Sequence, residues 1–153
     1  MSKRDGRDWH QGTFIPTNPD KWMNKDKISF RSSWECRFCN WLDQNPAVKK
    51  CGFEVVTIPY RFEIDGKIHK YTIDFYAEIL NNNNILDKYL IEIKPKHQSV
   101  EPVMPKRKSA KSMKNFLFEA KQYIRNQNKW KYAEQYCKAN GFTWKVLNEN
   151  KLF

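Results

Sequence analysis

Two charged residues at the end of an apolar run constrain this chain more than any other local pattern. The run Tyr89–Ile91 leads directly into Glu92, Ile93 and Lys94. Side chains of a β-strand alternate between two faces, so Glu92 and Lys94 share one face while Ile93 points the other way into a core. Burying either charge is costly unless it is paired or binds a metal. The pattern therefore predicts a strand that ends in an ion pair or in a metal site.

A second unusual carboxylate lies upstream. Asp74 occupies the apolar run Tyr71–Tyr76, although aspartate is disfavoured in strands. An aspartate on one strand and a Glu-x-Lys on a later one is the arrangement that a metal-dependent phosphodiesterase needs. The alternatives are an Asp74 that faces solvent and a Glu92–Lys94 ion pair of little energetic value.

The hydrophobic periodicity predicts one domain in the order helix, three strands, helix or helix pair, strand. The expected elements are a helix at about 32–45, strands at 55–62, 68–79 and 89–94, a helix from about 112 with a break near 126–128 and a stop at Gly141, and a strand at 142–147. On the second strand, one face should carry Tyr71, Ile73, Phe75, Ala77 and Ile79. The inner face of the last helix should carry Phe116, Leu117, Ala120, Tyr123 and Ile124.

Residues 1 to about 30 are polar, basic and interrupted by prolines, which predicts an irregular N-terminal arm ahead of a domain at 31–153. Its aromatic residues Trp9, Phe14 and Trp22 are too many for a free tail, so we expect the arm to pack on or near the domain. Three basic residues of the arm are candidates for phosphate contact, namely Lys3, Arg4 and Arg7.

The formal net charge of +11 points to an acidic polymer as partner, and nucleic acid is the commonest one. The alternative is a scaffold protein that uses its charge only for adhesion. No apolar segment approaches a membrane span, and no secretory signal is evident, so we expect a cytosolic protein. Cys36 and Cys39 form a CxxC with no second pair to complete a zinc site, which favours ordinary thiols.

Asp74 and Glu92 are the natural ligands for Mg²⁺, which takes oxygen donors and keeps several waters. The backbone carbonyl of Ile93 is a further candidate ligand. Lys94 is placed to position the attacking water or to neutralise charge on the phosphate. A third carboxylate, Glu35, falls on the first helix and completes the candidate metal site, although its position three residues after Ser32 also suits a capping box.

A proline-rich segment at 95–112 carries most of the candidate DNA contacts. The candidates for phosphate contact in and after it are Lys106, Arg107, Lys108, Lys111 and Lys114, and the alternative is a solvated basic loop. Arg31 and Gln98 are further candidates for DNA binding. Gln98 would contact phosphate or a metal-bound water, or else be a plain loop residue.

The order helix-Glu, strand, strand-Asp, strand-Glu-x-Lys, helix, strand resembles the PD-(D/E)xK nuclease superfamily, also called the restriction-endonuclease-like fold. The resemblance implies an α/β domain with a central mixed sheet flanked by helices. Longer segments are similar to the head completion nucleases of T4-like phages and, more distantly, to the endonuclease subunit of some transposition systems. These segments are 30–35, 43–48, 58–60, 65–75, 91–95 and 128–133. The superfamily name expects a proline where this chain has Ile73, and that proline does no chemistry.

The resemblance implies a Mg²⁺-dependent DNA endonuclease, with Mn²⁺ as a substitute, that acts late in phage head assembly before the tail joins. It implies Glu35, Asp74 and Glu92 as metal ligands and Lys94 as the catalytic lysine. The implied partners are DNA and the head, portal or neck proteins, and the implied setting is the host cytoplasm during assembly or the virion itself. The resemblance gives no reason to expect a membrane partner.

Two other functions are compatible with the same residues. One is a non-catalytic head or neck protein that binds DNA, although such a role needs none of the four site residues in this pattern. The other is a transposase-type or junction-resolving endonuclease with the same site and another substrate shape. Double-strand cleavage needs two active sites or two binding events, which is compatible with a homodimer.

Overall fold

The centre of the molecule is a mixed four-stranded sheet. The computed structural model describes residues 11–24 and 28–151. The strands are β3 (Val48–Phe62), β4 (Lys67–Leu80), β5 (Leu86–Ile93) and β6 (Thr143–Leu147), and they lie in the order β3-β4-β5-β6. Neighbours are antiparallel except for β5 and β6, which are parallel. The prediction of an α/β fold with a mixed sheet is therefore confirmed.

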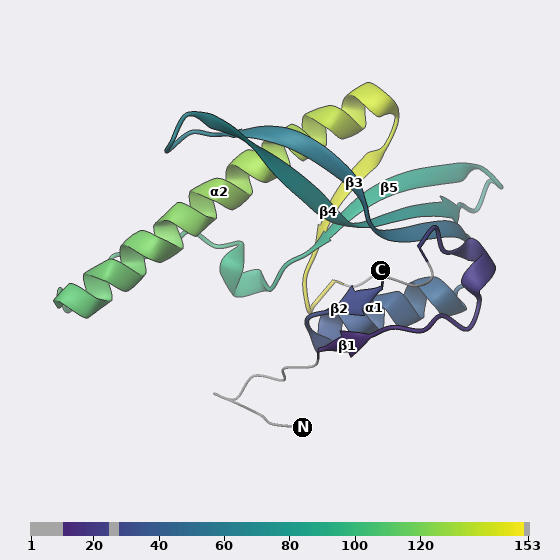
Figure 1. Cartoon of the computed structure of the whole chain (residues 1–153), viewed down its shortest axis with the longest axis horizontal. Helices are drawn as coiled ribbons and strands as arrows, with labels where there is room; N and C mark the ends of the chain where they lie inside the picture. Colours follow the sequence, from purple (N-terminus) through teal and green to yellow (C-terminus); the bar gives the residue numbers. More distant parts are fainter. Residues whose placement is uncertain (1–10, 25–27, 152–153) are drawn as a thin grey trace.

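Two helices cover opposite faces of this sheet (Figure 1). Helix α1 (Ser33–Gln44) packs Phe38 and Leu42 into one apolar cluster, together with Phe75 of β4. Helix α2 (Ala110–Asn140) packs Ala133 and Cys137 into a second cluster on the other face. The chain thus has two hydrophobic cores that share one sheet. The predicted stop of the last helix at Gly141 is confirmed, since this glycine caps α2 with a φ of 74°.

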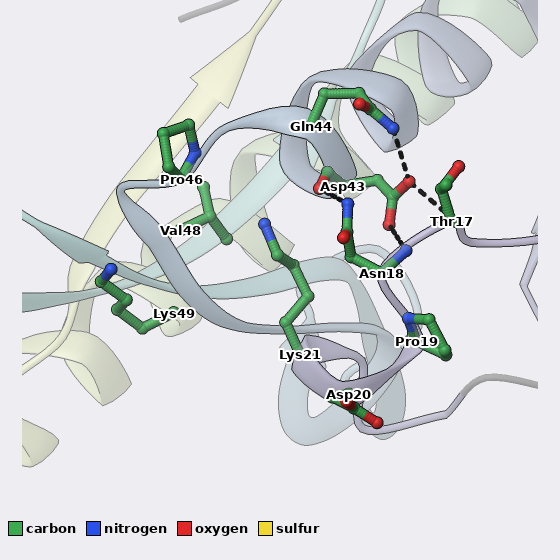
Figure 2. Close-up of a pocket in the computed structure, with 10 residues that line it drawn as sticks. All are labelled: Thr17, Asn18, Pro19, Asp20, Lys21, Asp43, Gln44, Pro46, Val48 and Lys49. Carbon is green, nitrogen blue, oxygen red and sulfur yellow. Dashed lines mark hydrogen bonds between the residues drawn. The ribbon is translucent and has the colours of Figure 1, made fainter.

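The N-terminal segment packs beside α1 through a buried carboxylate. It contains β1 (Gly12–Thr13), η1 (Pro19–Lys21) and β2 (Ser29–Phe30), and Phe14 and Trp22 join the α1 cluster. Figure 2 shows Asp43 of α1 accepting hydrogen bonds from the backbone of Thr17 and Asn18 and from the Gln44 side chain, beside a shallow pocket. Lys3, Arg4, Arg7 and Trp9 lie outside the described residues.

The prediction that one face of β4 carries five apolar residues is wrong. Tyr71 and Ile73 pack in the α2 cluster, whereas Phe75 and Ala77 pack in the α1 cluster. The pairing of β3 with β4 shifts between Phe53/Phe75 and Val56/Ile73, which marks a β-bulge opposite this point. A bulge bends and twists the sheet locally. Residues of β4 on either side of the bulge that would otherwise share one face therefore point to opposite faces of the sheet. Asp74 lies at this change of face, between the two cores.

The predicted break in the last helix is also wrong, because α2 continues through residues 126–128. Asn126 is buried with only 8% of its surface exposed. Asn128 accepts a hydrogen bond from the backbone N–H of Glu63 at 3.0 Å and donates to its carboxylate at 3.3 Å. Asn128 thus fastens the helix to the residue that follows β3, which explains why it interrupts the apolar stripe without breaking the helix.

The first turns of α2 extend beyond the sheet (Figure 1), and Ser109 caps their N-terminus. Leu117 keeps 62% of its surface exposed and Phe118 keeps 64%, so the predicted inner face at Leu117 is wrong. Strand β3 begins at Val48, seven residues before the predicted start at 55, because the bulge hides its alternation. No helix in the described part of the chain is long and apolar enough to cross a membrane.

Candidate active site

The Asp74 carboxylate lies at the junction of β4 and β5. Its Oδ2 accepts a hydrogen bond from the backbone N–H of Ile93 at 2.9 Å. Burial raises the pKa of Asp74 to about 7, and the charge of Glu35 adds to the rise, although the Ile93 bond opposes it. Residues with strongly shifted pKa values are common at functional sites, which makes Asp74 a candidate functional residue.

Glu92 is the most deeply buried of the predicted site carboxylates, with 6% of its surface exposed. Its Oε1 lies 3.7 Å from the Lys94 ammonium. Its Oε2 is buried and has no hydrogen-bond partner within the described structure. Burial raises the pKa of Glu92 to about 7, and Lys94 opposes the rise. The predicted Glu92–Lys94 pair therefore exists and leaves one carboxylate oxygen available.

Glu35 reaches the same site from the first turn of α1. Ser32 caps the helix by accepting from the backbone N–H of Glu35 at 3.2 Å. The Glu35 carboxylate accepts from the backbone N–H of Arg31 at 2.7 Å and not from that of Ser32, so only the Ser32 half of the capping-box alternative is present. Burial raises the pKa of Glu35, and the Lys94 charge lowers it. Glu35 thus has a structural contact and lies within electrostatic reach of the site.

Lys94 connects the three predicted carboxylates. Its ammonium charge lowers the pKa of Glu35, of Asp74 and of Glu92. One cation therefore acts on carboxylates that come from α1, β4 and β5. This convergence is the main electrostatic feature of the region.

Two charged residues near the site were missed by sequence reasoning. Glu54 lies at the β3 bulge with a φ of 51°, a left-handed conformation that is rare outside glycine, and its charge raises the pKa of both Asp74 and Glu35. Lys129 lies on α2, and its charge lowers the pKa of Glu92. The left-handed conformation and the placement of α2 have no local sequence signature, and although Lys129 falls in the segment 128–133 that resembles the phage nucleases, that resemblance assigned it no role.

Of the predicted DNA contacts, Arg31 adjoins the Glu35 carboxylate through its backbone N–H, whereas no hydrogen bond or ion pair within the described structure joins the others to a site carboxylate. The Arg31 side chain is 72% exposed and its guanidinium lies 3.5 Å from Glu54. Gln98 is exposed in η2 (Lys96–Gln98), directly after β5. The basic residues at 106–108 are exposed in the loop before α2, and Lys111 and Lys114 are exposed on its first turns. The basic residues at 106–108 form a basic surface with Lys111 and Lys114, and the role of this surface in DNA binding stays a prediction.

The residues suit a divalent cation in their chemistry, although they do not form a closed site. Among residues 11–24 and 28–151, no three Asp, Glu, His or Cys side chains converge closely enough to hold a metal. Yet the donors are carboxylate oxygens, Glu92 Oε2 lacks a partner, and burial disfavours the charge on Asp74 and Glu92. Hard divalent cations prefer such donors and stabilise such charges. The assignment of the metal ligands, including the Ile93 carbonyl, stays a prediction.

Comparison with known proteins gives the site a family. Residues 45–149 match the family described as TnsA-like endonuclease N terminal. The chain belongs to the TnsA-like endonuclease family. The match includes Asp74, Glu92 and Lys94, whereas Glu35 precedes it. The chain is also 32% identical over 144 residues to the head completion nuclease of Enterobacteria phage T4, covering 94% of this chain and 93% of that protein. The predicted resemblance of this TnsA-like endonuclease to the T4-type nucleases is thereby confirmed.

Proposed function

We propose that the protein is a metal-dependent DNA endonuclease that acts in phage head completion, late in assembly and before the tail joins. The observation that carries this proposal is that Asp74 accepts a hydrogen bond at 2.9 Å from the backbone N–H of Ile93, directly between Glu92 and Lys94, which pair at 3.7 Å. Family membership supports the endonuclease activity. A relative that is named a head completion nuclease and is covered over nearly its whole length supports the setting.

Asp74 and Glu92 would hold Mg²⁺, or Mn²⁺ in its place, with Glu35 and the Ile93 carbonyl as further donors. When bound, the metal supplies Lewis-acid stabilisation of the charge that develops on the phosphoryl oxygens. Lys94 holds a proton and a positive charge beside Glu92, where it orients the attacking water or contacts the phosphate. Burial of Asp74 and Glu92 excludes solvent from these groups and strengthens each of these interactions.

The substrate of this proposal is DNA, held by the basic surface of the protein. The exposed cluster at 106–108, with Lys111 and Lys114, would contact backbone phosphates, and Arg31 and Gln98 would contact DNA nearer the site. No element described here has the form of a sequence-reading module, so we propose weak base preference. Head, portal or neck proteins are the proposed partners, and host cytoplasm during assembly is the proposed location.

A transposase-type endonuclease is the second candidate, and the TnsA-like family match is the observation that favours it. Both candidates share the active site and differ in substrate shape and partner. The extent of similarity to the phage relative favours the first, because it includes nearly the full length of both chains.

The test is cleavage of plasmid and linear DNA by the purified protein with Mg²⁺ or Mn²⁺. Asp74→Ala, Glu92→Ala and Lys94→Ala should each abolish cleavage and leave DNA binding in a gel-shift assay nearly intact. Asp87→Asn is the matched control, because Asp87 lies at the opposite end of β5 and loses the same kind of charge.

A triple alanine variant that cuts as fast as the wild-type protein would show that the site is wrong. Wild-type protein that binds DNA and never cuts it, even in the presence of assembled heads, would favour the non-catalytic head or neck protein instead.

A further inference from the structure

The region between α2 and the sheet contains a cation that the proposed mechanism does not use. Lys129 projects from α2 so that its Nζ lies 5.2 Å from the centre of the Tyr71 ring and 5.9 Å from that of Tyr60. No ion pair within 4.0 Å joins it to a described carboxylate. Its charge nevertheless acts on Glu92 and Asp74, two of the predicted site residues.

Unpaired polar atoms gather in the same region. The described structure has four buried side-chain N or O atoms without a hydrogen-bond partner. They belong to Tyr71 of β4, Glu92 of β5, and Arg125 and Trp130 of α2. Tyr71 and Glu92 keep only 4% and 6% of their surfaces exposed. Buried polar atoms are rarely left unpaired in folded proteins, so these groups between α2 and the sheet are candidates for contact with a polar ligand.

The charges around Lys129 indicate which kind of ligand fits. Burial is the main cause that lowers the pKa of Lys129, and the charges of Lys94 and Arg125 add to it, whereas Glu92 and Asp74 oppose it. Arg125 is itself held in place, with its guanidinium 4.2 Å above the Phe62 ring and 3.3 Å from the Tyr60 hydroxyl. Glu92 already pairs with Lys94 at 3.7 Å. A further anion beside Lys129 would offset the cost of its buried charge.

Lys94 and Lys129 approach Glu92 from different elements. Lys94 directly follows β5, two residues after Glu92, whereas Lys129 lies on α2, which covers one face of the sheet. A nucleic-acid strand carries a phosphate at every nucleotide. A strand that places one phosphate at Lys94 would therefore bring a neighbouring phosphate toward α2.

We propose that Lys129 binds a DNA backbone phosphate next to the scissile one and thereby positions the strand over Glu92. This inference rests on the proposed endonuclease function for the identity of its ligand. The alternative is that Lys129 serves only as a charge partner that keeps Glu92 ionised.

These two roles separate in a background that lacks the Glu92 charge. We would measure the affinity of a short fluorescein-labelled duplex over a range of salt concentrations, in EDTA, for Glu92→Gln and for Glu92→Gln with Lys129→Gln. Lys131→Gln in the same background is the matched control, because Lys131 is two residues away on α2 and exposed. Lys129→Arg retains the charge, and thermal melting of each variant checks its folding.

A phosphate contact predicts that Lys129→Gln weakens binding about three- to tenfold and reduces the slope of log affinity against log salt by about one. Lys131→Gln should leave both quantities near their starting values, and Lys129→Arg should restore most of the affinity. Equal behaviour of Lys129→Gln and Lys131→Gln would overturn the inference. A loss of affinity with an unchanged salt slope would overturn it as well, because it would reflect packing.

Cleavage by single variants links the contact to the reaction. Lys129→Gln should lower kcat/KM at saturating metal, with the larger part of the effect in KM, while Lys131→Gln cuts normally. A wild-type protein that does not cut, even in the presence of assembled heads, would refute the proposed function and leave the binding result interpretable. A wild-type protein that cuts, with Lys129→Gln indistinguishable in KM and kcat, would refute this inference alone.

Discussion

The Asp74 carboxylate accepts a hydrogen bond from the backbone N–H of Ile93 at 2.9 Å, which ties β4 to β5 at the candidate active site. Because Ile93 lies between Glu92 and Lys94, this bond sets the position of Asp74 relative to both side chains. It also stabilises the charged form of Asp74, yet burial outweighs it and raises the pKa to about 7. The metal-free site therefore retains protons near neutral pH.

The first prediction is that metal-free protein loses stability as the pH rises from about 4 to about 7. The pKa values of Asp74 and Glu92 are raised to about 7 in the folded state and return to near 4 on unfolding. The folded protein thus binds more protons than the unfolded chain in this range, so the free energy of unfolding falls with rising pH. Thermal melting in EDTA measures the effect.

An Asp74→Asn, Glu92→Gln double variant should show a flatter melting profile over the same pH range and a higher melting temperature than the wild type at pH 8. Added Mn²⁺ should restore wild-type stability at pH 8 and leave the double variant unchanged. Parallel pH profiles for the two proteins would show that these carboxylates do not titrate as the structure indicates.

The order of the main elements was predictable from the sequence, because it depends on local alternation. Charged residues in otherwise apolar strands are conspicuous, and the structure places Asp74 against the Ile93 backbone and Glu92 against Lys94, while their role in catalysis stays a prediction. Glu54 and Lys129 were not predictable in the same way. Glu54 lies near the site because of the β3 bulge, and Lys129 lies near it because α2 packs over the sheet.

The two errors on the last helix have one physical origin. Helical periodicity predicts an apolar face but not what covers it, and the first turns of α2 extend beyond the sheet and leave Leu117 and Phe118 exposed. Further along, Asn126 and Asn128 interrupt the apolar stripe as a break would, although Asn128 makes two hydrogen bonds to Glu63. Which element packs against a helix face depends on the tertiary structure, and the hydrophobic pattern of the helix alone does not predict it.

The second prediction concerns the basic surface at the start of α2. Replacing Lys106, Arg107 and Lys108 with glutamine should weaken DNA binding and lower the salt slope by about 0.9 for each phosphate that the variant no longer binds. Fluorescence anisotropy over a range of salt concentrations measures both quantities. Replacing Lys49, Lys50 and Lys138 instead provides a control of equal charge on exposed positions elsewhere. An unchanged slope in the first variant would remove this loop from the DNA-binding surface.

The third prediction tests why a glutamate occupies a left-handed position at the β3 bulge. Glu54→Gly removes the backbone strain at φ 51°, so the free energy of unfolding should be unchanged or higher by up to about 1 kcal/mol. Cleavage should nevertheless fall, because the carboxylate acts on Asp74 and Glu35. Glu54→Gln keeps the strain and removes only the charge, so it should lower cleavage without the gain in stability. Full activity in both variants would restrict Glu54 to a structural role.

The last prediction concerns Asp43, which fastens the N-terminal segment to α1. Burial disfavours its charge, but hydrogen bonds from Thr17, Asn18, Trp22 and Gln44 outweigh this and hold the pKa of Asp43 below its usual value. Asp43→Asn places an amide donor against these donors and should cost about 1–3 kcal/mol at pH 7.

The sign of the pH dependence follows from the lowered pKa of Asp43. Its contribution is complete above the unfolded pKa near 4 and is lost as the pH falls through the folded value, so the difference between wild type and Asp43→Asn should shrink below pH 4. Urea unfolding at pH 7 and pH 3 measures it, with the exposed Asp20→Asn as the matched control. If the difference in the free energy of unfolding between wild type and Asp43→Asn stayed constant with pH, the contact would depend on the shape of the Asp43 side chain and not on its charge. The site carboxylates have the opposite sign, so acid should weaken the attachment of the N-terminal segment while it relieves the charge at Asp74 and Glu92.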